Sequence, residues 1–129
     1  MERNVVGWFE IYVDDIVRAR SFYEAVFEVK LENLTAEGGA ASHDLQMWAF
    51  TGDPNAGGAA GSLVKMEGCK AGGNSTIVYF SCADCAVEAG RAAANGGRIF
   101  KDKFSIGQYG YIALVEDTEG NIIGLHSMQ

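Results

Sequence analysis

The order of apolar and polar residues predicts a strand, a helix and three further strands in the first half of the chain. Residues 5–13 are rich in Val, Ile and aromatic side chains and alternate in character, which is typical of a strand. Residues 16–27 repeat apolar side chains at spacings of three and one, which predicts an amphipathic helix capped by Asp14 or Asp15. The three further strands are expected at residues 28–34, 45–51 and 62–66.

The same order of elements starts again after a polar, glycine-rich stretch at residues 69–75. Residues 75–82 predict a strand, and Asp84 can cap a helix that ends near Asn95. The glycine pair at 96–97 follows where a left-handed cap is expected. Three more strands are expected at residues 98–100, 109–116 and 122–128.

The two halves match each other with an offset of about 68 residues. Residues 8–27 correspond to residues 76–95, and the later turns of the two halves also coincide. We therefore expect two βαβββ modules, residues 1–68 and 69–129, that share one structural domain. The match depends on pattern and turn position, because few residues are identical between the halves.

Composition excludes several classes of partner. The chain has 129 residues, with 10 Lys and Arg against 17 Asp and Glu, so its formal net charge is −7. Such a surface repels phosphates, and we expect neither nucleic acid nor a membrane as a partner. Apolar residues make up 48% of the chain, which is enough for a packed core, and no apolar run has the length of a membrane span.

The cysteines predict a reducing location. An odd number of cysteines, three, and an N-terminal stretch without a signal segment favour the cytoplasm. Cys82 and Cys85 form a C-x-x-C where a strand meets a helix, a position that can lower a thiol pKa. A redox pair usually faces a proline, and Pro54 lies in a glycine-rich turn instead. We therefore interpret both cysteines as small packed residues.

The closing turn, residues 117–121, has the form D-x-[DE]-G-N. Together with the duplicated βαβββ pattern, the stretches WFEIYVDDIVRARSFYEAVFEVKLE (8–32) and YGYIALVEDTEGNIIGLHSM (109–128) resemble the vicinal oxygen chelate superfamily. That superfamily includes glyoxalase I, bleomycin-resistance proteins and extradiol dioxygenases. The resemblance implies an α+β fold in which two tandem modules form an open, cup-shaped mixed sheet with helices on the outside. It does not select a function, since these modules host isomerases, dioxygenases, transferases and metal-free drug binders.

Enzymes of that superfamily hold a metal ion with His, Gln or Glu from the first and last strands of each module. The resemblance places these positions at Trp8, Thr76 or Ile77, Gly61 or Ser62, and Gly124. A divalent ion needs nitrogen or oxygen donors, which only Ser62 or Thr76 would supply, and weakly. We therefore expect no cofactor, with a divalent metal (Zn, Ni, Fe or Mn) as the alternative.

Two nearby residues offer catalytic chemistry. Strand parity keeps Glu10 on the face of Trp8 and His126 on the face of Gly124. The resemblance makes those faces the lining of the cleft. Glu10 and His126 are therefore candidate ligands of a displaced metal, or a candidate acid–base pair. The alternative is a carboxylate and an imidazole that are satisfied by hydrogen bonds in a polar pocket floor.

Aromatic side chains on predicted strands are candidates for ligand binding. These candidates are Trp8, Tyr12, Trp48, Phe50, Phe80, Tyr109 and Tyr111. Facing the cleft, they would suit a flat or apolar molecule; otherwise they pack between the sheets and the helices. The glycine-flanked segment at residues 105–110 is a candidate rim or lid.

Three functions stay open at this point. The first is a glyoxalase/bleomycin-resistance-like protein that binds a small apolar or aromatic molecule between the modules without metal. The second is a glyoxalase-like lyase or dioxygenase-type enzyme that uses a displaced metal or the Glu10 and His126 pair. The third is an interaction module with its cup buried against a partner. Half-covered sheets predict a homodimer, with the modules paired either within one chain or across the dimer.

Overall fold

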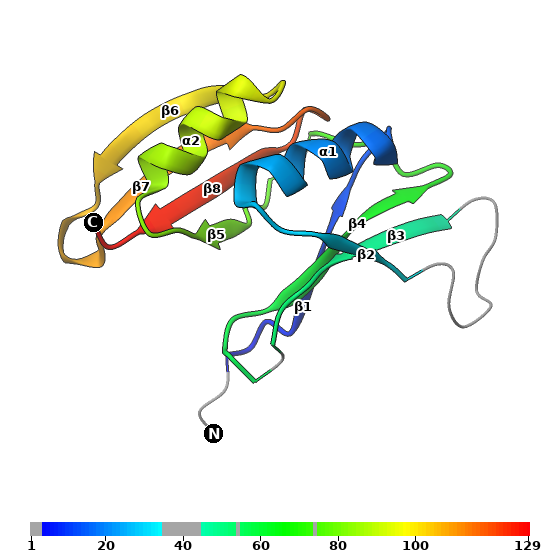
Figure 1. The fold of residues 1–129 in the computed structure, drawn as a ribbon, viewed down its shortest axis with the longest axis horizontal. Coiled ribbons are helices and arrows are strands. Elements are labelled where there is room, and N and C mark those ends of the chain that lie inside the picture. The colour runs from blue at the N-terminus through cyan, green and yellow to red at the C-terminus, as the bar shows by residue number, and fades with distance from the viewer. Residues whose placement is uncertain (1–3, 35–44, 54, 74) are drawn as a thin grey trace.

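The computed structural model describes residues 4–34, 45–53, 55–73 and 75–129, which form two four-stranded sheets and two α-helices (Figure 1). The first module contains β1 (Trp8–Tyr12), α1 (Ile16–Phe27), β2 (Leu31–Asn33), β3 (Leu45–Phe50) and β4 (Ala60–Met66). The second contains β5 (Tyr79–Ser81), α2 (Cys85–Ala94), β6 (Arg98–Ser105), the short 3-10 helix η1 (Gly107–Tyr109), β7 (Tyr111–Glu116) and β8 (Ile122–Ser127). The βαβββ order predicted for both halves is confirmed.

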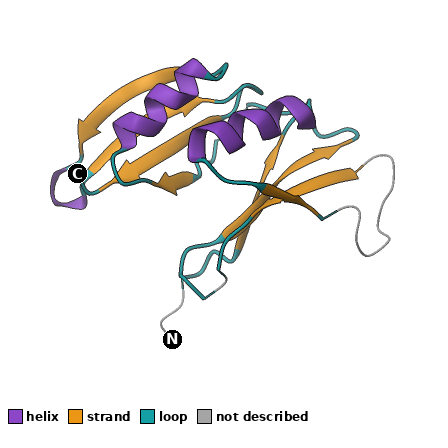
Figure 2. Ribbon diagram, in the orientation of Figure 1, coloured by secondary structure: helices purple, strands orange, loops and turns teal. Residues whose placement is uncertain are grey.

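Both sheets are mixed and have the same topology. Their strand orders are β1-β4-β3-β2 and β5-β8-β7-β6. The first strand of each module pairs in parallel with the last, and the other pairs are antiparallel. In Figure 2 the two helices lie side by side and the sheets diverge from each other; α1 and α2 also contact each other. None of the helices in the described ranges is long and apolar enough to cross a membrane.

The helix α1 begins and ends where its sequence predicts. The Asp15 side chain accepts hydrogen bonds from the backbone amides of Val17 and Arg18, as an N-cap does. The helix closes after Phe27 because Glu28 adopts a left-handed conformation, with φ 55°. The strand expected over residues 28–34 is therefore shortened to β2, since its first residues belong to the turn that ends the helix.

Other strand boundaries also differ from the prediction. β5 covers only part of residues 75–82, and β7 starts after η1 rather than at residue 109. β6 extends well beyond residues 98–100, because it is an edge strand and tolerates the charged residues that follow. Pro54 lies outside the described residues, and beside it the Asn55 amide donates to Asp53 Oδ1 (2.8 Å).

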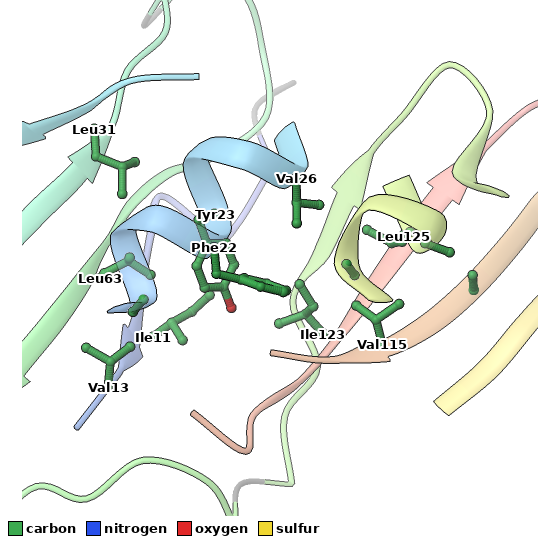
Figure 3. Close-up of a cluster of buried hydrophobic side chains, with 14 of the residues drawn as sticks. Ile11, Val13, Phe22, Tyr23, Val26, Leu31, Leu63, Val115, Ile123 and Leu125 are labelled. Carbon is green, nitrogen blue, oxygen red and sulfur yellow. The ribbon is translucent and has the colours of Figure 1, made fainter. Parts of the chain in front are cut away.

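One hydrophobic core joins the two modules, because the helix-facing sides of both sheets contribute to it (Figure 3). From the first module it contains Ile11, Val13, Phe22, Tyr23 and Leu63, and from the second Val115, Ile123 and Leu125. Odd-numbered residues of β1 and β8 thus face the core. The opposite face of each sheet carries the even-numbered residues of these two strands.

The closing turn of the second module holds the start of the first helix. Glu119 Oε1 accepts from the backbone amides of Asp14 and Asp15 (both 3.0 Å), and both carboxylate oxygens accept from the Arg18 guanidinium. Further along α1, the buried Tyr23 hydroxyl donates to Asp117 Oδ2 (2.7 Å). These contacts fix the two modules relative to each other, so cavities between them have defined walls.

Candidate functional site

Two cavities lie where the modules meet. The first, here called the Glu10 cavity, has a volume of about 340 Å³ and lies between β1, the connection after β4 and the start of β8. Its lining includes Glu10, Tyr12, Cys69, Lys70, Val78 and Ile122. The second, here called the phenylalanine cleft, has about 360 Å³. Its lining includes Phe9, Phe27, Phe50, Phe80, Tyr79 and Glu88.

The side chains of Trp8, Glu10 and Tyr12 form a hydrogen-bonded row on β1. The Tyr12 hydroxyl donates to Glu10 Oε1 (2.8 Å), and the Trp8 indole Nε1 donates to Glu10 Oε2 (3.3 Å). These contacts confirm that the three residues share one face of the strand, as their spacing predicts. The hydrogen bond to Glu10, with burial and the nearby charge of Glu10, raises the pKa of Tyr12. Tyr12 is therefore a donor that orients the carboxylate.

Asn121 fixes the backbone around the Glu10 cavity. Its Nδ2 donates to the carbonyl oxygen of Tyr12 (3.0 Å), and its Oδ1 accepts from the amide of Gly72 (2.8 Å). It thus links β1, the inter-module connection and the closing turn. Local sequence patterns do not mark Asn121, Cys69 or Lys70 as site residues. The D-x-[DE]-G-N turn was the available signal for Asn121, but a turn motif does not show which strand its amide reaches.

His126 and Tyr109 come together at a different place. His126 Nε2 donates to the carbonyl oxygen of Tyr109 (2.6 Å), which ties η1 to β8. The expected rim segment is therefore an ordered turn held by this histidine. His126 is not among the residues that line the Glu10 cavity. Within the described residues the two candidates do not share a cavity, and the acid–base pair stays a prediction.

The remaining aromatic candidates lie on core-facing sides of the sheets. Phe50 and Phe80 line the phenylalanine cleft. Trp48 pairs with the buried Leu63 and lies under the Arg20 guanidinium, whose Cζ is 3.5 Å from the ring centroid. Tyr111 packs against the core, with Lys103 Nζ 4.8 Å from its ring. Trp48 and Tyr111 are not among the residues that line either cavity, so their part in ligand binding stays a prediction.

Cys82 and Cys85, the two cysteines of the C-x-x-C, lie in surroundings that disfavour a thiolate. Burial, together with the nearby Glu88 carboxylate, raises the pKa of the Cys82 thiol to about 12. Cys85 is fully buried at the start of α2. A redox pair needs an accessible thiolate near neutral pH, so this environment opposes redox chemistry.

Comparison with known proteins identifies the family. The family model described as Glyoxalase/Bleomycin resistance protein/Dioxygenase superfamily matches residues 5–125. The chain belongs to this superfamily. No curated protein sequence matches the chain at a significant level.

Solved structures of superfamily members share the fold. A glyoxalase/bleomycin resistance protein from Albidiferax ferrireducens T118 has 19% identity and a TM-score of 0.69, covering 95% of this chain and 98% of that chain. TnmS3, an antibiotic binding protein from Streptomyces sp. CB03234, has 19% identity and a TM-score of 0.68, covering 100% and 99%. Glyoxalase I from Zea mays has 17% identity and a TM-score of 0.70, and the match covers 93% of this chain and 44% of the maize protein.

The structure aligns with one another the four positions at which the resemblance to the superfamily implies metal ligands. Trp8 and Ile77 lie at the same distance before the aspartates that cap the two helices, Asp15 and Asp84. The counterpart of Trp8 is therefore Ile77 rather than Thr76. In the two parallel strand pairs, Glu10 lies opposite Ser62 and Tyr79 lies opposite Gly124. Ser62 and Gly124 are therefore the equivalent positions on the last strands.

The donor set at these four positions does not fit the superfamily metal. An indole (Trp8), an alkyl group (Ile77), a hydroxyl (Ser62) and a glycine without a side chain (Gly124) replace the expected imidazole, amide or carboxylate groups. The Tyr79 ring also lies so close to Gly124 that a Cβ there would collide with it. Elsewhere in the described ranges, no three His, Cys, Asp or Glu side chains gather as a metal site.

Proposed function

We propose that this superfamily member binds a small, apolar or aromatic organic molecule in the Glu10 cavity and does so without the superfamily metal. The observation that carries the proposal is a cavity of about 340 Å³ with one oriented carboxylate, in a chain whose metal positions lack metal donors. Pockets of this size with apolar walls and a few fixed polar groups are typical of small-molecule sites.

The polar groups of the cavity define what the ligand offers. Each oxygen of Glu10 accepts one hydrogen bond from a neighbour on β1 and keeps acceptor capacity for a ligand N–H or O–H group. Val78 and Ile122 supply apolar wall. A ligand with an apolar body and one donor group therefore matches the cavity. The antibiotic binding protein TnmS3 is a precedent for ligand binding on this fold.

The proposal includes a homodimer in a reducing compartment such as the cytoplasm. Trp8, Ile77 and Tyr79 are large apolar side chains on the open faces of β1 and the segment through β5, with 44%, 40% and 48% exposure. A second copy would cover such surface. All three cysteines are free thiols, which suits a reducing location.

Native mass spectrometry of untagged protein, followed by a thermal-shift screen of apolar and aromatic compounds, tests the proposal. We expect a bound organic molecule or a screening hit, no stoichiometric metal, and a dimer mass. Glu10→Gln and Tyr12→Phe should each weaken binding by about three- to tenfold, since each removes part of one oriented hydrogen bond. Glu32→Gln on exposed β2 is the matched control and should bind as the native chain does.

Two results would contradict binding without metal. One is stoichiometric Zn, Ni, Fe or Mn in the purified protein. The other is catalytic turnover that disappears in both Glu10→Gln and His126→Gln, which would establish the enzyme alternative. A monomeric mass would contradict the homodimer alone.

A further inference from the structure

The phenylalanine cleft is built from aromatic rings of both modules. Phe80 of β5 stacks on Phe27 of α1, with ring centroids 4.4 Å apart and an interplanar angle of 21°. Phe9 of β1 meets Phe80 edge to face at 6.1 Å, and Phe50 of β3 lies 5.6 Å from Phe80. Because Phe9, Phe50 and Phe80 are only half-buried, the rings border the open space instead of closing it.

One carboxylate enters this aromatic lining. Glu88 of α2 has only 16% of its side chain exposed, and its Oε1 is buried without a hydrogen-bond donor in the described residues. Its Oε2 lies 3.8 Å from Arg91 Nη1, a long contact. The Cys82 thiol interacts with the Glu88 carboxylate through a side-chain hydrogen bond, and an S–H group is only a weak donor. A buried carboxylate oxygen without a donor is costly, so a group that donates to it would be stabilised here.

The charges beside the cleft leave an excess of negative charge. Arg91 is shared between Glu88 and Glu28, whose Oε2 lies 3.5 Å from Arg91 Nη2, and Arg91 Nη1 also donates to the Val26 carbonyl oxygen (3.2 Å). One cation thus faces two carboxylates. The whole chain carries a formal net charge of −7, which also attracts cations.

We propose that the phenylalanine cleft is a second binding site, separate from the Glu10 cavity, for a small organic cation with an aromatic body. The charged N–H group of such a ligand donates to Glu88 Oε1. Its body and charge lie against the faces of Phe9 and Phe80, where the ring quadrupole attracts a cation. Anionic ligands are disfavoured by Glu88, and a neutral ligand of the same shape lacks the attraction to both the carboxylate and the rings.

A matched pair of probes tests this site in the full chain. We would titrate 1-naphthylmethylammonium and the neutral 1-naphthylmethanol by calorimetry and map the contacts by amide chemical shifts. The cation should bind about tenfold or more tightly than the alcohol, with shifts concentrated at Phe80 and Glu88. In Glu88→Gln, which keeps shape and removes charge, this preference should fall below about threefold.

Two further variants separate this site from the other cavity. Phe80→Leu keeps apolar volume but removes the ring, and it should weaken the cation several-fold. Because Glu10 is a second carboxylate that can attract the cation, Glu10→Gln removes binding at the other cavity, while the cation-induced amide shifts at Phe80 and Glu88 should persist with the same affinity. These site-specific shifts keep the test independent of the function proposed for the Glu10 cavity. Amide spectra of each variant check that it is folded.

Three outcomes would overturn the proposal. The first is equal affinity for the two probes, and the second is an undiminished preference in Glu88→Gln. The third is occupancy of the cleft by a second copy, seen as a sedimentation dimer that Phe80→Leu dissociates while the cation fails to bind either form.

Discussion

At the residue scale, Glu119 is the side chain through which the closing turn holds the start of α1. Burial acts to raise its pKa, but hydrogen bonds from Arg18, Thr118 and two backbone amides outweigh burial and lower the pKa to about 2. Because the folded state lowers the pKa from 4.5, ionised Glu119 stabilises the fold above pH 4.5, and that stabilisation is lost as the pH falls toward 2.

Glu119→Gln should therefore destabilise the protein by about 2 kcal/mol at pH 7, since it removes the charge that Arg18 and two amides share. The difference from the native chain should narrow as the pH falls from 4.5 toward 2. Urea unfolding at a series of pH values measures both effects. A constant difference across that range would contradict the assignment of the acid dependence to Glu119.

Asp117 acts with the opposite sign. Burial raises its pKa despite the hydrogen bonds that it accepts from Tyr23 and from the turn. Its favourable contribution is complete below the unfolded pKa of 3.8 and is lost as the pH rises through the folded value. As the pH falls, Asp117 therefore offsets part of the stability that is lost through protonation of Glu119. Comparison of Glu119→Gln with the native chain isolates the contribution of Glu119.

The contact between Gly124 and Tyr79 gives a second prediction at this scale. Gly124→Ala should destabilise the protein by about 1–3 kcal/mol, because the new Cβ meets the Tyr79 ring. In a Tyr79→Ala background the same change should cost less than about 0.5 kcal/mol. Chemical unfolding of the native chain, the two single variants and the double variant measures these free energies. Equal costs in both backgrounds would show that the ring is not the obstacle.

At the element scale, the capping aspartates decide where the helices begin. Asp15→Ala removes the acceptor for the Val17 and Arg18 amides and should cost about 1 kcal/mol of stability. Asp15→Asn keeps an acceptor oxygen and should cost only a few tenths. Thermal unfolding followed by circular dichroism compares them. Similar losses in both variants would assign the effect to the charge of Asp15 rather than to its cap.

Helix positions could be predicted from sequence because caps and apolar spacing are local signals. The faces of β1 were predictable for the same reason, since its core side is consistently apolar. The sides of the sheet to which Trp48 and Tyr111 point could not be predicted, because β3 and β7 carry apolar residues on both sides. Which side is buried depends on where the covering helix packs. The cavity lining was beyond local signals, since Asn121 reaches β1 across 109 positions in the chain.

At the scale of the whole molecule, the shared core predicts that the modules unfold together. Both tryptophans, Trp8 and Trp48, report on the first module, while the His126 ring reports on the second. Thermal unfolding followed by tryptophan fluorescence and by the His126 proton resonances should give coincident midpoints. Two separated transitions would show that the contacts of the closing turn and the common core do not couple the modules.

The distance in sequence between Glu119 and the helix start that it holds also has a consequence for biosynthesis. The amides of Asp14 and Asp15 are made early by the ribosome, whereas the carboxylate that accepts their hydrogen bonds emerges more than a hundred residues later. A nascent chain stalled before this point leaves the start of its first helix bonded to water and half of its core uncovered. Completion of the first module therefore requires synthesis of the second, so we expect products truncated before Glu119 to be substrates for chaperones and proteases rather than stable half-proteins.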